Sequence, residues 1–146
     1  MTTIYIDGDA CPVKEEVFRA AEKRGIRVFV VANTHIRTPA IAESVVVKDG
    51  LDAADDYIAE HAVKGDAVIT ADIGLAARCV KSGAACISPT GKFFTEENIG
   101  SAVATRDLMK HIRQVTGKEL GPRPFSDKDR RRFMKEFSQL LDRLLT

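Results

Sequence analysis

Short apolar stretches rich in β-branched residues alternate with segments of helical periodicity in the first part of this chain. The strand-like stretches cover residues 3–6, 26–31, 44–47, 67–70 and 84–87. Three of the intervals between them carry apolar residues at helical spacing, and each of these ends at a glycine. Continuous apolar strands that alternate with helices are typical of a parallel sheet covered on both faces. We therefore predict an α/β protein, a three-layer α/β/α sandwich with a mostly parallel central sheet.

The pattern changes after the fifth strand. Residues 95–115 are expected to form a helix, 117–124 a linker punctuated by Gly and Pro, and 127–145 an amphipathic helix. A chain of 146 residues suits one domain. We treat residues 1–146 as a single α/β domain whose C-terminal part, 95–146, is helical and basic.

The composition is that of an ordinary globular protein, with 45% hydrophobic and 29% charged residues. No apolar run approaches the roughly 20 residues that span a bilayer, and no export signal precedes the first strand, so we expect a cytoplasmic protein without a membrane partner. The three cysteines include no Cys-x-x-Cys pair, so we expect thiols. Cys11, at the start of a helix, is a weak candidate nucleophile because nearby carboxylates oppose its ionisation.

Aspartates follow the strands at the edge where ligands bind in open parallel sheets, namely the carboxyl ends. Asp7 and Asp9 follow the first strand, and Asp72 follows the fourth. The helix after the third strand opens with Asp52, Asp55 and Asp56. Three separate stretches of sequence thus bring carboxylates to one edge of the sheet.

Such a cluster of like charges is unfavourable unless a cation compensates it. Oxygen ligands without a Cys/His cluster favour a hard ion, so we expect Mg²⁺ or Mn²⁺, which can activate water for attack on a phosphodiester. Each acid also has a structural interpretation: Asp7 as a turn cap, Asp52 and Asp55 as a helix cap, and Asp72 as the cap of the next helix. The choice of third ligand among Asp52, Asp55 and Asp56 stays open.

Basic residues are concentrated near the C-terminus, where residues 104–132 hold nine Lys or Arg and four acids. This pattern suits either a solvated surface or contacts to a nucleic-acid backbone that are independent of sequence. Only 6% of the residues are aromatic, which argues against a base-stacking platform. A loop after the second strand lies at the same sheet edge as the acids. The candidate phosphate-binding residues are Asn33, Arg37, Thr38, Arg106, Lys110, Arg113, Arg123, Arg130 and Arg131.

Four stretches of the chain together resemble the bacterial YaiI/YqxD family, also called UPF0178 or DUF188. They are Asp7-Gly-Asp-Ala-Cys-Pro-Val-Lys14, residues 47–58, residues 65–76 and Gly121-Pro-Arg-Pro-Phe125. This family is grouped with the PIN-like and NYN-like nuclease folds, whose metal-binding acids follow the first strand, open a central helix and follow the fourth strand in a Thr-x-Asp pattern.

The resemblance implies a PIN-like fold with Asp7, Asp72 and either Asp55 or Asp52 as metal ligands, and Asp9 as an additional acid. Members often carry Asp-Ala-Asp and Asp-Ile-Pro where this chain has Gly8 and Gly74. Both departures keep the carboxylates but change the backbone freedom of the loops.

Taken together, these patterns predict a Mg²⁺- or Mn²⁺-dependent nuclease, a phosphodiester hydrolase acting on RNA. Asp7, Asp9, Asp55 and Asp72 are the expected catalytic and metal-binding residues, with Asp52 and Asp56 as further metal candidates. One alternative is an RNA-binding module without catalysis on the same scaffold. A second is a haloacid-dehalogenase-like phosphatase with Asp7 and Asp9 as nucleophile and acid, although Ala10-Cys11-Pro12 lacks the hydroxyl residue that this class requires.

Overall fold

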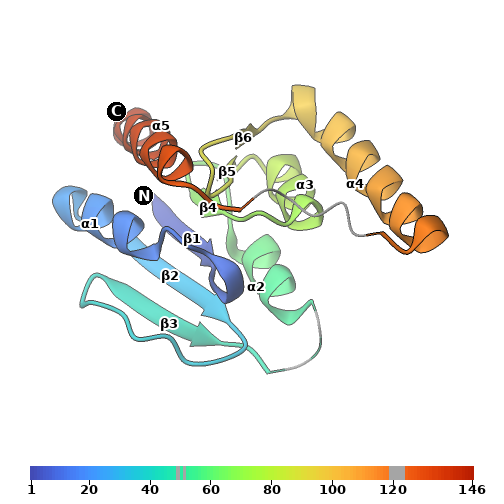
Figure 1. Cartoon of the computed structure of the whole chain (residues 1–146). Coiled ribbons are helices and arrows are strands. Elements are labelled where there is room, and N and C mark those ends of the chain that lie inside the picture. The colour runs from blue at the N-terminus through green and yellow to red at the C-terminus, as the bar shows by residue number, and fades with distance from the viewer. Residues whose placement is uncertain (49, 51, 119–123) are drawn as a thin grey trace.

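The computed structural model describes residues 1–48, 50, 52–118 and 124–146, which form a six-stranded sheet and five α-helices (Figure 1). The strands are β1 (Thr3–Asp7), β2 (Arg27–Ala32), β3 (Ala42–Val46), β4 (Ala67–Ile69), β5 (Ala85–Ile87) and β6 (Phe93–Phe94). The helices are α1 (Lys14–Arg24), α2 (Ala53–His61), α3 (Ile73–Lys81), α4 (Glu96–Thr116) and α5 (Asp127–Leu145), and a short 3-10 helix, η1 (Gly8–Ala10), follows β1.

The strand order across the sheet is β3-β2-β1-β4-β5-β6. The first five strands are parallel, and β6 runs antiparallel to β5. The chain first builds the sheet outward from β1 in one direction and then, with β4, continues on the other side of β1. The carboxyl ends of β1 and β4 therefore form the topological switch point, where open α/β sheets place their ligand crevice.

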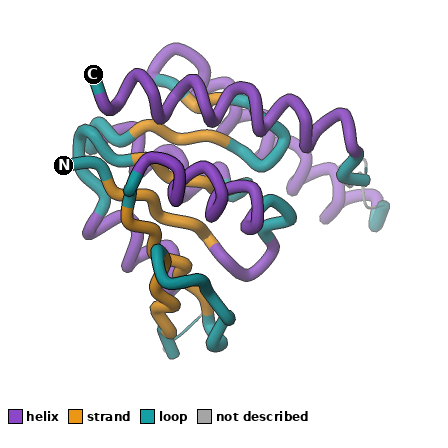
Figure 2. Tube along the Cα trace, turned by 90° about the vertical axis from the view of Figure 1, so that its left-hand side faces the viewer, coloured by secondary structure: helices purple, strands orange, loops and turns teal. Residues whose placement is uncertain are grey.

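Helices cover both faces of the sheet, as predicted (Figures 1 and 2). On one face, α1 and α5 bury Val17, Phe18, Phe133 and Phe137 against alternate side chains of the strands. On the other face, α2 and α3 pack against the intervening strand residues, with Ile58 among the buried side chains. The continuous apolar strands of the sequence follow from this arrangement, because both sides of each central strand are buried.

Helix α4 lies on the outer side of α3 and projects from the sheet (Figure 1). None of its side chains is buried. It starts with a capping box in which the hydroxyl of Thr95 accepts from the Asn98 amide, while the Asn98 side chain accepts from the Thr95 amide. Within the part of the chain that the structure describes, no helix has the length and apolar character needed to cross a membrane.

The structure departs from the predicted elements at three places. Strand β3 covers 42–46 rather than 44–47, and α1 begins at Lys14 rather than at Cys11, where the sequence placed the start of a helix. Strand β6 was not predicted, because two residues are too few to show a period. It forms since a tight turn, in which Gly91 N donates to Ser88 O and Ser88 N donates to Lys92 O, reverses the chain after β5.

Candidate functional site

Asp7 and Asp72 are connected by the hydroxyl group of Thr70 at the switch point of the sheet. Asp7 is the last residue of β1, and its Oδ2 accepts a 2.9 Å hydrogen bond from Thr70 Oγ1. The same oxygen of Thr70 accepts a hydrogen bond of 2.9 Å from the Asp72 amide. Thr70 is only 2% exposed. A buried threonine after β4 thus fixes an acid of β1 relative to the first turn of α3.

Asp72 has the structural role that the sequence left open. Its Oδ1 accepts a 3.0 Å hydrogen bond from the Leu75 amide, and its carbonyl accepts from Ala76 N, so it is the N-cap of α3. The cap holds the carboxylate in one orientation at the positive end of the helix dipole, which stabilises its negative charge. By contrast, Asp7 and Asp52 stand at cap positions of η1 and α2, but neither side chain makes a capping hydrogen bond.

Asp55 lies in the first turn of α2, and the other acids influence its pKa. Burial raises its pKa to about 6, and the negative charges of Asp72, Asp7 and Asp52 add to this effect, while Arg78 opposes it. Burial also raises the pKa of Asp7, with further contributions from Asp72 and Asp9, whereas the hydrogen bond from Thr70 lowers it. The negatively charged acids at the ends of β1, α2 and α3 therefore repel one another. We call this group the acidic cluster; it consists of Asp7, Asp55 and Asp72, with Asp9 and Asp52 at its margin.

Asp56 is engaged in an ion pair. Its Oδ1 lies 2.7 Å from Arg78 Nη1 in an ion pair between α2 and α3. Asp9 is exposed on η1, and its Oδ1 accepts a 3.2 Å hydrogen bond from the Asn33 amide, which joins η1 to the end of β2. Asp56 and Asp9 thus have other partners than Asp7 has.

A pocket of about 300 Å³ opens between β1 and β4, lined by Asp7, Cys11, Thr70, Ala71, Asp72 and Pro89. Burial, together with the charges of Asp7 and Glu16, raises the pKa of the Cys11 thiol to about 11. The thiol is therefore protonated at neutral pH, which argues against a nucleophilic role. Asp55 is outside the lining of this pocket and acts on it through its charge.

The acidic cluster suits a hard cation that keeps most of its water. Mg²⁺ commonly binds through one or two carboxylates and several waters. Within the described residues, no three His, Cys, Asp or Glu side chains lie close enough together to hold an ion by themselves. Asp7 and Asp72 line one pocket, and their mutual repulsion is the feature that a cation between them would relieve.

Basic side chains approach the cluster from two sides. Arg106, on α4, reaches the first turn of α3: its Nη1 is 2.9 Å from the position that a Cβ atom on Gly74 would occupy. Lys14, on α1, donates to the carbonyl of Cys11 at 3.3 Å, and no carboxylate of the described chain lies within ion-pair distance of it. Lys110 and Arg113 continue the basic face of α4 and are exposed.

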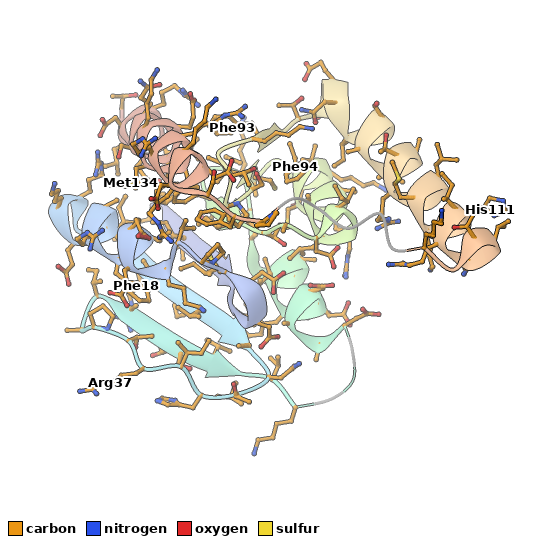
Figure 3. The ribbon with its side chains drawn as sticks, in the orientation of Figure 1. Phe18, Arg37, Phe93, Phe94, His111 and Met134 are labelled. Carbon is orange, nitrogen blue, oxygen red and sulfur yellow. The ribbon has the colours of Figure 1, made fainter. Side chains whose placement is uncertain are left out.

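The remaining predicted phosphate contacts are scattered. Arg130 donates to Pro12 O at 2.9 Å and to Glu16 Oε1 at 2.6 Å, so it joins α5 to the start of α1. Arg131 is exposed on α5. Thr38 donates to the carbonyl of Ala42 at the start of β3, and Arg37 points into solvent on the opposite side of the molecule from α4 (Figure 3). Arg123 lies outside the described residues.

Three residues at the site had no assigned role in the sequence: Thr70, Lys14 and Gly74. The role of Thr70 could have been found from the sequence, because it is a hydroxyl residue that directly follows an apolar strand and precedes an acid by two positions. Lys14 follows Asp9 of η1 closely in the chain, and sequence spacing alone does not distinguish it from an ordinary surface lysine. Nothing in the sequence indicates the approach of Arg106 to Gly74, because α4 and α3 meet only in the folded chain.

The fold and the site define a class: an open, doubly wound α/β protein with an acidic pocket at its switch point. The sequence model described as "Uncharacterized BCR, YaiI/YqxD family" matches residues 5–143. The chain belongs to this family, as its sequence indicated.

The relatives in this family share about half of their residues with this chain. A UPF0178 protein of Nitrobacter winogradskyi is 49% identical over 146 residues, which cover 97% of this chain and 91% of the relative. A UPF0178 protein of Rhodopseudomonas palustris is 49% identical over 99% of this chain and 92% of its own length. The UPF0178 protein bll3966 of Bradyrhizobium diazoefficiens is 49% identical over 98% and 87%, respectively. No solved structure shows significant similarity to the chain.

Proposed function

We propose that this protein is a Mg²⁺- or Mn²⁺-dependent phosphodiester hydrolase that acts on RNA, with a PIN-like arrangement of acids. The observation that carries the proposal is the pairing of Asp7 with Asp72 through Thr70 in one pocket, with Asp55 raised in pKa beside them. Acids held this close at the ligand-binding edge of a parallel sheet need a cation, and the basic residues around them suit an anionic substrate.

Asp7 and Asp72 are the residues that would hold the ion. When bound, such an ion lowers the pKa of water and neutralises charge on a phosphodiester. Thr70 joins the carboxylate of Asp7 to the backbone amide of Asp72. Asp55, with a pKa of about 6, is mostly ionised at neutral pH and adds negative charge next to the two carboxylates that would hold the ion.

The cations position the substrate in this proposal. Lys14 has two N–H groups besides the one that Cys11 O accepts, and no carboxylate of the described residues lies within ion-pair distance of it. Arg106 holds its guanidinium at the start of α3, next to Asp72. A phosphate group between these side chains and the acidic cluster would be contacted from both sides. The exposed Lys110 and Arg113 extend the same basic face along the backbone of a nucleic acid.

Titration calorimetry with Mn²⁺ tests the metal site. We expect binding by the wild type and its loss in Asp7→Asn and Asp72→Asn, since each removes a charge from the pocket. Asp56→Asn is the matched control, because Asp56 pairs with Arg78 outside the acidic cluster, and it should bind like the wild type. Equal heats for the wild type and for Asp7→Asn would refute the metal site.

Cleavage is tested separately, with single-stranded RNA in the presence of Mn²⁺ or EDTA. We expect slow cleavage that EDTA abolishes. Lys14→Ala should cleave RNA less efficiently than the wild type, because its KM for RNA is larger. Among the residues that the structure describes, no three acids form a preformed ligand set, and this observation favours the second candidate, an RNA-binding module without catalysis. That candidate predicts RNA binding that falls steeply with salt, is unaffected by EDTA, and leaves the RNA intact.

A further inference from the structure

Two of the three cysteines, Cys79 and Cys86, meet in the core on the side of the sheet that carries α2 and α3. Cys79 is on α3 and is 0% exposed, and Cys86 is on β5 and is 1% exposed. The thiols of Cys79 and Cys86 are in hydrogen-bonding contact with each other. The third cysteine, Cys11, belongs to the core on the opposite face of the sheet.

The backbone holds the two thiols in this position. The chain leaves α3, turns at Gly83 and enters β5, and the Ala84 amide donates to the carbonyl of Cys79 at 3.1 Å. The sulfur of Cys86 lies 3.9 Å from Ala76 O and 3.8 Å from Ala84 O. Cys86 is therefore surrounded by α3 on one side and by its own strand on the other, and its sulfur has Cys79 as its reactive neighbour.

An opening leads toward Cys86 from the surface. A pocket of about 490 Å³ lies at the sheet edge between α3, β6 and α5, and Cys86 is among its lining residues, together with Val80, Phe94 and Leu140. Figure 3 labels Phe94 at this edge. The pocket brings the surface close to Cys86, whereas Cys79 is not among its lining residues, and neither thiol is on the outer surface.

We propose that Cys79 and Cys86 form an intramolecular disulfide when a peroxide oxidises the protein. One sulfur attacks an oxygen of the peroxide, the O–O bond breaks, and a sulfenic acid and one water are formed. The second sulfur then attacks the sulfenic sulfur, and its proton leaves with the hydroxyl group as a second water. The two thiols are thereby oxidised by two electrons, and one peroxide is reduced to two waters.

Cys79 is the more acidic of the two thiols, whereas Cys86 is the one that lines the pocket. The hydrogen bond with Cys86 and the positive charge of Arg78 lower the pKa of Cys79, while the pKa of Cys86 is raised. The thiolate is the nucleophilic form, so the pair contains one activated sulfur and one resolving thiol. The disulfide would join α3, which begins at Asp72, directly to β5. This inference does not depend on the proposed hydrolase activity.

The test is peroxide treatment of the folded protein, followed by alkylation with iodoacetamide in denaturant and intact-mass measurement. We expect the wild type to lose two hydrogen atoms and to accept one alkyl group, on Cys11, instead of three. Dithiothreitol should restore all three. Cys11→Ser should still form the bond and then accept no alkyl group, whereas Cys79→Ala and Cys86→Ala should not form it.

Peptide mapping of the oxidised wild type gives a second measurement that needs no variant. A linked peptide that contains Cys79 and Cys86 supports the proposal. Three alkylated cysteines after treatment, oxidation of Cys11 alone, or a disulfide between two molecules would each overturn it. The same treatment in urea is the control: a bond that forms there at the same rate as in the folded protein also contradicts the proposal, since the native contact would then have no effect.

Discussion

At the scale of single residues, one buried hydroxyl group orders the acidic cluster. Thr70 donates to Asp7 and accepts from the Asp72 amide, so its oxygen satisfies a carboxylate of one element and a backbone donor of another. Hydrogen bonds to charged groups are worth more than neutral ones, and a buried donor that loses its acceptor costs its full desolvation. The position of both acids therefore depends on a residue that is not itself charged.

Thr70→Val removes this hydroxyl group and keeps the shape of the side chain. We expect the free energy of unfolding to fall by about 1.5–3 kcal/mol, because Asp7 loses a donor and the Asp72 amide loses its acceptor. Urea denaturation measures this change. Thr70→Ser keeps both hydrogen bonds and should cost less than half as much. Equal losses in the two variants would show that packing of the methyl group, rather than the hydrogen bonds, is responsible.

The raised pKa of Asp55 predicts how the stability of the fold changes with pH. Its pKa of about 6 in the folded protein exceeds the ordinary 3.8, so the folded protein binds this proton more tightly than the unfolded chain does. Its protonation stabilises the fold at low pH, and this contribution disappears as the pH rises from about 4 through 6. Asp55→Asn should therefore have a higher Tm than the wild type at pH 7 and nearly the same Tm at pH 4.

The control for this experiment is Asp56→Asn. Asp56 neighbours Asp55 in the chain, but its carboxylate pairs with Arg78. Thermal unfolding at pH 7 should show no gain in Tm for this variant, since it removes an attraction instead of a repulsion. A lower Tm for Asp55→Asn than for the wild type at pH 7 would contradict the clustering of the acids.

At the scale of elements, the turn between β5 and β6 contacts the backbone of α5. Gly91 has φ +87, and a Cβ atom there would lie 2.9 Å from Phe133 N and 3.0 Å from Arg132 C. Both neighbours are backbone atoms of a helix, so they cannot move aside as a flexible side chain could. The turn and the helix thus fit together only when this residue is glycine.

Gly91→Ala should be strongly destabilising, by about 2–4 kcal/mol, because it combines a left-handed backbone with a clash. Gly100 provides the comparison, since it lies in α4 with nothing within 4 Å of an added Cβ atom. Gly100→Ala should raise the free energy of unfolding by roughly 0.5–1 kcal/mol through helix propensity. Chemical denaturation of both variants measures the difference. A loss for Gly91→Ala below about 1 kcal/mol would be inconsistent with the close contact.

Most elements could be predicted from the sequence, because hydrophobic period and chain punctuation determine them locally. The five parallel strands and five helices lie within a few residues of their expected positions. Strand β6 and η1 could not be predicted, since each is too short to show a period. The sequence also placed the acids at one sheet edge, because that follows from parallel topology.

Distances between side chains could not be predicted in this way. The sequence did not separate Asp55 from Asp56, which differ only in the direction that helix α2 gives them. One joins the acidic cluster, and the other turns to Arg78 on α3. It also grouped Arg130 with the phosphate contacts, because a local count of charge does not show that Glu16 is its partner. Contacts between distant parts of the chain decide both cases.

At the scale of the whole molecule, the C-terminal helix completes the domain. Helix α5 lies along α1, and contacts at both ends join the two: Arg130 with Glu16 near their starts and Arg24 with Asp142 near their ends. Phe133, Phe137 and Leu141 of α5 are buried in the same core as the side chains of α1. The fold is therefore stabilised by an element far from β1 in sequence, and the basic C-terminal part is not an appended tail.

The contribution of α5 to stability can be tested at the Glu16–Arg130 ion pair. The side chain of Glu16 is 9% exposed, and its Oε2 is buried without a hydrogen-bond partner among the described residues. Arg130→Met would leave that buried carboxylate with only the 3.9 Å contact to Arg19, which should cost about 2–4 kcal/mol. Arg131→Met, one position along and exposed, should change the urea midpoint little. The double variant Glu16→Gln with Arg130→Met should recover most of the loss, because it removes the buried charge. If Arg130→Met and Arg131→Met unfold at the same urea concentration, the pair does not hold α5 to α1, and Arg130 would be free to contact phosphate.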